Sequence, residues 1–250
     1  MGLTITENLA YWHMPKTGGM SVYKYLQAGG DNYQIVSGYA RHGRAETIAS
    51  SILKGRTLFG TIRNPWHWYA SLYQMAMRSE EGQEILMDYG NGSLEFRPVL
   101  RGLTRPLEVE KFPKENFGII FQIENGSEEI WADDFLSSGL GLFSWVFRYC
   151  YGRPIKPDVF VDTQQLVAGV SELLLCSPEV LKGINPQNKA EHFPYNYLGP
   201  AEDLYETDMI EWIYESDVGL IETFGFEPFK QMKSPTVNAS DLLFSPSFIG

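Results

Sequence analysis

The chain has 250 residues, of which 44% are hydrophobic and 14% aromatic, so it can bury a core and is not a disordered chain. No apolar run approaches the roughly 20 residues that cross a bilayer, and we expect no membrane span. The net charge is −11, yet residues 1–80 carry eight Lys and Arg against four acids. This concentration of basic charge favours a small anionic ligand and argues against a nucleic-acid surface.

The two cysteines, Cys150 and Cys176, have neither the spacing of a metal site nor that of a disulfide framework. We therefore expect buried thiols, no bound metal and a reducing, cytoplasmic setting. No secretion signal pattern is visible at the N-terminus, which agrees with that expectation.

The first predicted elements enclose a glycine-rich turn. Residues 9–12 (LAYW) are typical of a buried strand, and residues 22–28 are typical of a helix. Between them lies His-Met-Pro-Lys-Thr-Gly-Gly-Met-Ser, residues 13–21. A strand, a glycine-rich turn with a lysine and a helix start form an arrangement that binds phosphate, because backbone N–H groups and the helix dipole face the anion.

A second strand-to-helix junction follows about forty residues later. Residues 57–62 predict a buried strand that ends at Arg63. Asn64 is a good N-cap and Pro65 suits the first helical position, so we expect a helix over 66–77 whose aromatic residues pack in the core. Between the junctions we expect a strand over 33–36, a polar loop and a helix over 45–53.

The remainder of the chain gives weaker signals. Residues 80–115 contain several Pro and Gly and are expected to be irregular. The further expected elements are strands at 118–123 and 158–162, a helix over 131–151 interrupted near 139–141, a helix over 164–175, a polar loop at 185–190, and a helix over 202–224 closed by Gly225.

Alternating strands and helices predict an α/β fold with a mainly parallel sheet, whose ligands bind at the C-terminal ends of the strands. No repeat or linker is visible, so we expect one domain over residues 1–230. Residues 231–250 are rich in Ser, Pro and Asn and are expected to form a loosely ordered tail.

The order of residues in the turn distinguishes it from the ATPase loop. A Walker A motif has its lysine after the glycines, whereas Lys16 precedes Gly18 and Gly19. A magnesium-dependent kinase or NTPase also needs a carboxylate on a second strand, and Asp162 is the candidate. This enzyme class remains an alternative, as does a nucleotide-binding protein without turnover.

The two junctions together resemble a known family. P-K-T-G-G-x-S after a first strand, followed by I-R-N-P-W-x-W-Y-x-S-x-Y, is similar to the sulfotransferase superfamily that uses 3′-phosphoadenosine 5′-phosphosulfate (PAPS). The segments L-F-S-W-V-F-R-Y and N-P-Q-N-K-A-E-H are similar to its bacterial and carbohydrate-type branch. The resemblance implies a P-loop-NTPase-like three-layer fold, a central sheet flanked by helices, and metal-independent transfer to a hydroxyl.

The resemblance also implies roles for particular residues. The 5′-phosphosulfate would be held by Lys16, Thr17, Gly18, Gly19, Met20 and Ser21. The 3′-phosphate of PAPS, and of its product PAP, would be bound by Arg63 and Ser71, with a contribution from Lys189. Met20 departs from the family, which often has Thr there, so one side-chain hydroxyl is lost.

The catalytic groups follow from the same resemblance. Lys16 would neutralise the leaving phosphate. His42, in the loop after the second strand, lies where related enzymes keep their general base, and Glu46 is the second candidate. Among the other histidines, we expect His13 to be packed, His67 to face solvent and His192 to approach the donor.

The acceptor is less defined by the sequence. We expect a carbohydrate or another small hydroxyl compound, in a pocket formed by residues 79–115 and 131–151. The sequence indicates neither the identity of this acceptor nor the oligomeric state.

Overall fold

The computed structural model describes residues 3–29, 32–37, 43–109, 112, 128–152, 156–184 and 200–244. Contacts between residues divide the chain into two compact units. Unit 1 comprises Met1–Arg63, Phe147–His192 and Gln231–Gly250, and unit 2 comprises Asn64–Val146 and Phe193–Lys230. The expectation of one domain over 1–230 stays a prediction.

Unit 1 is built on a six-stranded mixed sheet with the strand order β3-β1-β2-β4-β5-β6. The three central strands, β2, β4 and β5, are parallel, while β1, β3 and β6 pair antiparallel with their neighbours. The described chain is therefore an α/β protein. The strands are β1 (Leu3–Ile5), β2 (Leu9–Trp12), β3 (Gln34–Val36), β4 (Thr57–Ile62), β5 (Val159–Asp162) and β6 (Thr236–Asn238).

The three parallel strands place the polar residues that follow them at one edge of the sheet. Tyr11 of β2 pairs with Phe59 of β4, and Ile62 at the end of β4 pairs with Asp162 at the end of β5. Because β2, β4 and β5 run in the same direction, the residues that follow each strand leave the sheet at the same edge.

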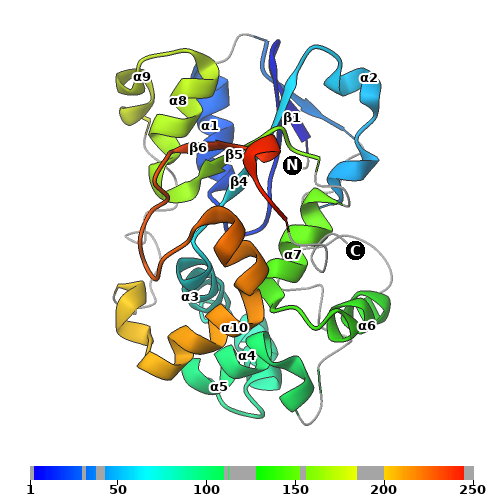
Figure 1. The fold of residues 1–250 in the computed structure, drawn as a ribbon, viewed down its shortest axis with the longest axis vertical. Helices are drawn as coiled ribbons and strands as arrows, with labels where there is room; N and C mark the ends of the chain where they lie inside the picture. The colour runs from blue at the N-terminus through cyan, green and yellow to red at the C-terminus, as the bar shows by residue number, and fades with distance from the viewer. Residues whose placement is uncertain are drawn as a thin grey trace. The chain divides into compact units, whose positions relative to one another are not determined.

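Three helices pack together over the sheet of unit 1 (Figure 1). They are α1 (Gly19–Gly29), α8 (Leu166–Leu174) and α9 (Pro178–Lys182). Their apolar residues join those of β2, β4 and β5 in one cluster, which includes Tyr11, Leu26, Phe59, Val170 and Leu181. This cluster fixes the N-terminus of α1 beside the segment that follows β5.

Unit 2 is helical within its described residues. Helices α3, α4, α5 and α10 pack against one another. Unit 2 contains α3 (Pro65–Ala76), α4 (Glu80–Tyr89), α5 (Phe96–Thr104), α6 (Glu128–Ser138) and α10 (Thr207–Phe224), and α7 (Leu142–Tyr151) begins in it and ends in unit 1. No helix in the described part of the chain is both long and apolar enough to cross a membrane.

Short segments complete the described elements. Helix α2 (Ser50–Leu53) follows a 3₁₀ turn at Ala45–Thr47, so the helix expected over 45–53 is divided in two. Further 3₁₀ turns lie at Pro106–Glu108, Thr163–Gln165, Ala201–Leu204 and Ala239–Asp241. The last of the long helices, α10, ends at Gly225, whose φ of 64° confirms the predicted C-cap.

Most strong sequence signals are confirmed. Strands β2 and β4 have the predicted bounds, and α3 begins at Pro65 with Asn64 as its N-cap. The interruption expected near 139–141 separates α6 from α7. The strand predicted at 118–123 and the loop at 185–190 lie outside the described residues.

The prediction of irregular structure over 80–115 is wrong, because this stretch contains α4 and α5. Ser79 caps α4 by accepting a hydrogen bond from Gly82 N, at 3.0 Å. Pro98 lies in the first turn of α5, where its missing N–H has no helical partner to lose. Pro98 therefore marks a helix start, and Pro106 begins a 3₁₀ turn.

The predicted tail contains an ordered strand. β6 pairs antiparallel with β5, with Val237 opposite Phe160, and Asp162 N donates a hydrogen bond to Pro235 O at 2.9 Å. The chain from residue 231 therefore returns to the edge of the sheet. Both β6 and β1 have three residues, too few to give a periodic signal in the sequence.

Candidate functional site

The turn between β2 and α1 has an unusual backbone. Lys16 has a φ of 65° and Gly18 a φ of 78°, both in the left-handed region. Glycine adopts this conformation freely, but for lysine it costs about 1 kcal/mol or more, and such strain gathers at functional sites. Gly18 O accepts the first bonds of α1, from Ser21 N and Val22 N at 2.9 and 3.2 Å. Gly18 thus caps α1 without a side chain to cover its first N–H groups.

A chain of buried hydroxyl groups supports the turn from the interior of the protein. Thr17 Oγ1 donates to Met14 O at 2.6 Å and lies 2.8 Å from Thr61 Oγ1. Thr61 Oγ1 in turn lies 3.0 Å from Tyr11 Oη. The hydroxyl of Thr17 is therefore occupied inside the protein, so its contribution to a ligand is limited to the backbone.

Tyr151, at the end of α7, anchors the turn from the side of β4. Its hydroxyl donates to Thr61 O at 2.7 Å and accepts from Met14 N at 3.2 Å. Burial raises the pKa of Tyr151 well above its usual value, so the phenol keeps the proton that it donates. Gly60 makes room for this ring, because a Cβ there would lie 2.7 Å from it.

The structure brings the two sequence motifs into contact. Arg63 follows β4, and its Nη1 donates to Lys16 O at 3.3 Å. Thr163, at the start of the segment after β5, donates from Oγ1 to Ile62 O at 2.7 Å and contacts Thr17 O at 3.3 Å. The ends of all three parallel strands therefore converge on the turn, and a guanidinium is among the groups they bring there.

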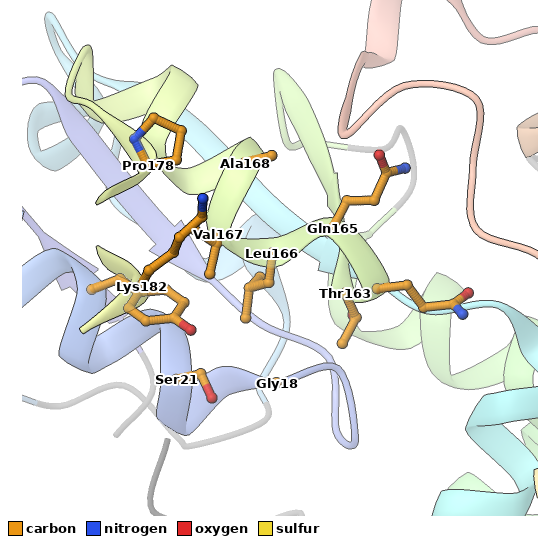
Figure 2. Close-up of a pocket in the computed structure, with 11 residues that line it drawn as sticks. Gly18, Ser21, Thr163, Gln165, Leu166, Val167, Ala168, Pro178 and Lys182 are labelled. Atoms are coloured by element: carbon orange, nitrogen blue, oxygen red, sulfur yellow. The ribbon is translucent and has the colours of Figure 1, made fainter. Parts of the chain in front are cut away.

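A pocket of about 670 Å³ opens beside the turn, within unit 1 (Figure 2). Figure 2 shows Gly18 and Ser21 of the α1 start below Leu166 and Val167 of α8, with Pro178 and Lys182 of α9 to the left. Apolar side chains make most of its surface, and hydroxyl, amide and ammonium groups add polar contacts. The lining residues are Gly18, Ser21, Tyr25, Thr163, Gln164, Gln165, Leu166, Val167, Ala168, Pro178 and Lys182.

Asp162, the candidate magnesium ligand, is fully buried and bonded to N–H groups. Its Oδ1 accepts from Gln164 N at 3.0 Å, and its Oδ2 accepts from Met232 N at 2.9 Å and Gln165 Nε2 at 3.2 Å. The carboxylate therefore caps the turn after β5 and fixes the returning C-terminal segment. These bonds leave it little capacity to bind a metal ion.

The structure describes only one of the two candidates for the general base. Glu46 is exposed on the 3₁₀ turn at Ala45–Thr47, and its carboxylate pairs with Arg44 Nε at 3.1 Å. His42 lies outside the described residues, as do His192 and Lys189. The choice between His42 and Glu46 stays open.

Ser71 and two further histidines lie in described segments. Ser71 is half-buried on α3 of unit 2, whereas the contacts described above lie in unit 1. His67 is also half-buried, with Nε2 3.2 Å from Phe229 O, so the expectation that it faces solvent is wrong. His13 is buried between Tyr11 and Tyr23, as predicted.

Several residues that shape the site were not predicted. Gly60 within a buried strand was a usable signal, because glycine there often marks a close approach of another group. Thr61 is a polar residue in the same apolar strand, which also indicates an internal partner. Tyr151 and the pocket residues of α8 and α9 are distant in sequence, and no local pattern marks them.

Comparisons with known proteins add no relative. The chain matches no family model, no curated protein and no solved structure.

Proposed function

We propose that the chain is a PAPS-dependent sulfotransferase with a P-loop-like α/β fold that transfers a sulfuryl group to a hydroxyl without a metal ion. The contact between Arg63 and Lys16 carries the proposal, because it joins the two motifs that suggested a donor with two separate phosphate groups. A guanidinium suits a phosphate dianion, which it binds through parallel hydrogen bonds.

The start of α1 has the properties of a 5′-phosphosulfate site. Gly18 leaves the first N–H groups of the helix without a side-chain cap, and the positive end of the helix dipole lies there. The left-handed Lys16 places an ammonium group on the same turn. Supported from below by Thr17, Thr61 and Tyr151, this turn is preorganised to bind an anion.

The pocket beside Gly18 and Ser21 supports a nucleotide donor. It shares both residues with the turn, so an anion held at the start of α1 could extend its nucleoside into the pocket. The volume of about 670 Å³ falls within the usual range for small-ligand sites, roughly 300–1,000 Å³. The apolar residues Leu166, Val167 and Ala168 line it and suit the face of a purine.

When bound, PAPS supplies the sulfuryl group, which passes to an acceptor hydroxyl as the bond to the phosphate oxygen breaks. Lys16 would stabilise the charge that this oxygen gains, and His42 or Glu46 would take the hydroxyl proton. Ser71 and Lys189 would contribute to the 3′-phosphate, as the resemblance implies. A carbohydrate or another small hydroxyl compound remains the expected acceptor.

The bonds of Asp162 favour this proposal over a magnesium-dependent kinase, because a kinase needs that carboxylate for its metal. A thermal-shift comparison of PAP, ATP and ATP with magnesium tests the choice. We expect PAP to stabilise the protein in the presence of a chelator. A preference for ATP with magnesium would contradict the proposal.

Turnover separates an enzyme from a protein that only binds nucleotide. Release of PAP from PAPS should depend on an added hydroxyl acceptor from a panel of sugars, lipids and phenols. We expect His42→Ala to bind PAP with unchanged affinity and to lose turnover. If His42→Ala still turns over and Glu46→Gln does not, Glu46 is the base, and if no acceptor in the panel supports release, the binding-only alternative is favoured.

A further inference from the structure

His13 lies directly after β2 and is only 4% exposed. Its ring stacks on Tyr11 with centroids 5.6 Å apart and meets the ring of Tyr23 edge-on at 5.8 Å. Its Nδ1 lies 3.3 Å from Tyr23 Oη, within hydrogen-bond distance. Two neighbours therefore fix both the plane and the rotation of the imidazole.

Gly19, the first residue of α1, lies against the Cδ2, Nε2 and Cε1 atoms of the same ring. A Cβ built on Gly19 would lie 2.6 Å from both Cδ2 and Nε2 of His13. No side chain fits at residue 19 while the imidazole keeps this position. The imidazole therefore packs directly against the backbone from which the first N–H groups of α1 project.

We infer that His13 is a positioning residue of the turn: its ring, oriented by Tyr23, supports the backbone of Gly19 and so sets the direction of the N–H groups at the start of α1. This inference rests on the proposed function, because those N–H groups are the ones assigned to the 5′-phosphosulfate. His13 acts through Gly19 and takes no part in proton transfer.

The ring itself, more than its polar atoms, provides the support. Gly19 lies closest to the ring atoms Cδ2, Nε2 and Cε1, while Nδ1 serves to hold the ring in place through Tyr23. His13→Phe keeps a flat ring of similar size and should keep most of the PAP affinity. His13→Asn keeps an acceptor for Tyr23 but lacks the ring, and it should bind PAP as weakly as His13→Ala.

The test is a titration calorimetry cycle with PAP in the absence of metal. We expect Gly19→Ala and His13→Ala each to raise the Kd of PAP by about tenfold, because each disturbs the same backbone. The double variant should bind about as well as His13→Ala alone, since removal of the ring makes room for the new methyl group. Two independent losses would instead multiply to about a hundredfold.

A control separates positioning from general destabilisation. Thr104→Val removes a buried hydrogen bond in α5 of unit 2, from Thr104 Oγ1 to Leu100 O at 2.9 Å, and should lower stability without changing the Kd of PAP. If the wild type binds PAP and His13→Ala binds equally well, or if the two losses multiply, the inference is overturned and the proposed function stands. If the wild type binds no PAP, both are overturned.

Discussion

The two helices that follow strands β2 and β4 begin in different ways. At the start of α1, the capping residue is Gly18, which has no side chain to accept a bond from the first N–H groups. At the start of α3, Asn64 Oδ1 accepts from Trp66 N at 3.1 Å, and Pro65 has no N–H. A side chain therefore caps the N-terminus of α3, while Gly18 gives α1 no such cap.

The difference extends to the surroundings of each helix start. Asn64 Nδ2 also donates to Glu227 O and Lys230 O at 2.7 and 3.0 Å, which ties the end of unit 2 to α3. Around α1 the hydroxyls of Thr17, Thr61 and Tyr151 hold the turn from below. The polar groups of Asn64 cap and anchor α3, whereas those around α1 support a turn that we propose binds an anion.

Removal of the lysine from the turn before α1 should have the greatest effect. Lys16→Ala should weaken PAP binding by about a hundredfold, because it removes a full charge from the proposed anion site. Stability should change little, since the left-handed strain at residue 16 remains with alanine. The control Lys54→Ala removes an exposed charge elsewhere in unit 1 and should leave the Kd, measured by titration calorimetry, unchanged. Equal losses in the two variants would indicate only a general charge effect.

The junction before α3 should respond in stability. Asn64→Ala removes the cap of α3 and the side-chain hydrogen bonds to Glu227 O and Lys230 O, which should lower the free energy of unfolding by about 2–3 kcal/mol. Ser79→Ala removes only a cap, that of α4, and should cost about 1 kcal/mol. Urea denaturation measures both. Similar values for the two variants would contradict a special role for Asn64.

A smaller effect is expected when the hydroxyl of Thr61, which contacts Thr17 in the turn, is removed. Thr61→Val keeps the shape of the side chain but removes the hydroxyl between Thr17 and Tyr11, which should cost about 1 kcal/mol of stability and also weaken PAP binding. Thr57→Val, at the start of the same strand, is the matched control. If Thr61→Val loses stability but keeps the wild-type Kd, the hydroxyl chain supports the core and not the anion site.

The smallest effect concerns the buried carboxyl group of Asp217, which is bonded to Tyr69 of α3. Tyr69 Oη donates to Asp217 Oδ2 at 2.9 Å, and Ser144 N donates to Oδ1 at 2.8 Å. Burial raises the pKa of Asp217, although the bonds from Ser144 and Tyr69 offset part of the increase. A carboxyl whose pKa is higher in the folded state binds its proton more tightly there, so its titration lowers stability as the pH rises.

The stability of the wild type relative to Asp217→Asn should therefore decrease as the pH increases from about 4, the usual carboxyl pKa, through the raised value. Urea midpoints of both proteins across this range measure the difference. The Kd of PAP should be the same in both proteins at each pH. A stability difference that does not depend on pH would contradict the assignment to Asp217.

The two junctions also show what the sequence could and could not reveal. Asn64-Pro65 is a local signal, and β4, the cap and α3 lie where it predicts. The turn at 13–21 is likewise a local signal, because its glycines and lysine are adjacent in the chain. Contacts made by residues far apart, such as Tyr151 with Met14, leave no local pattern. The number of prolines does not predict the structure of residues 80–115, because Pro98 suits the first turn of a helix as well as a loop.

Titration calorimetry of PAP and 5′-AMP against the wild type and Arg63→Ala, without metal, is the sharpest test of the proposed donor. We expect the wild type to bind PAP at least about tenfold more tightly than 5′-AMP, because Arg63 is proposed to contact the 3′-phosphate, and we expect Arg63→Ala to lose this preference. Equal affinity of the wild type for the two nucleotides, or an unchanged preference in Arg63→Ala, would contradict it.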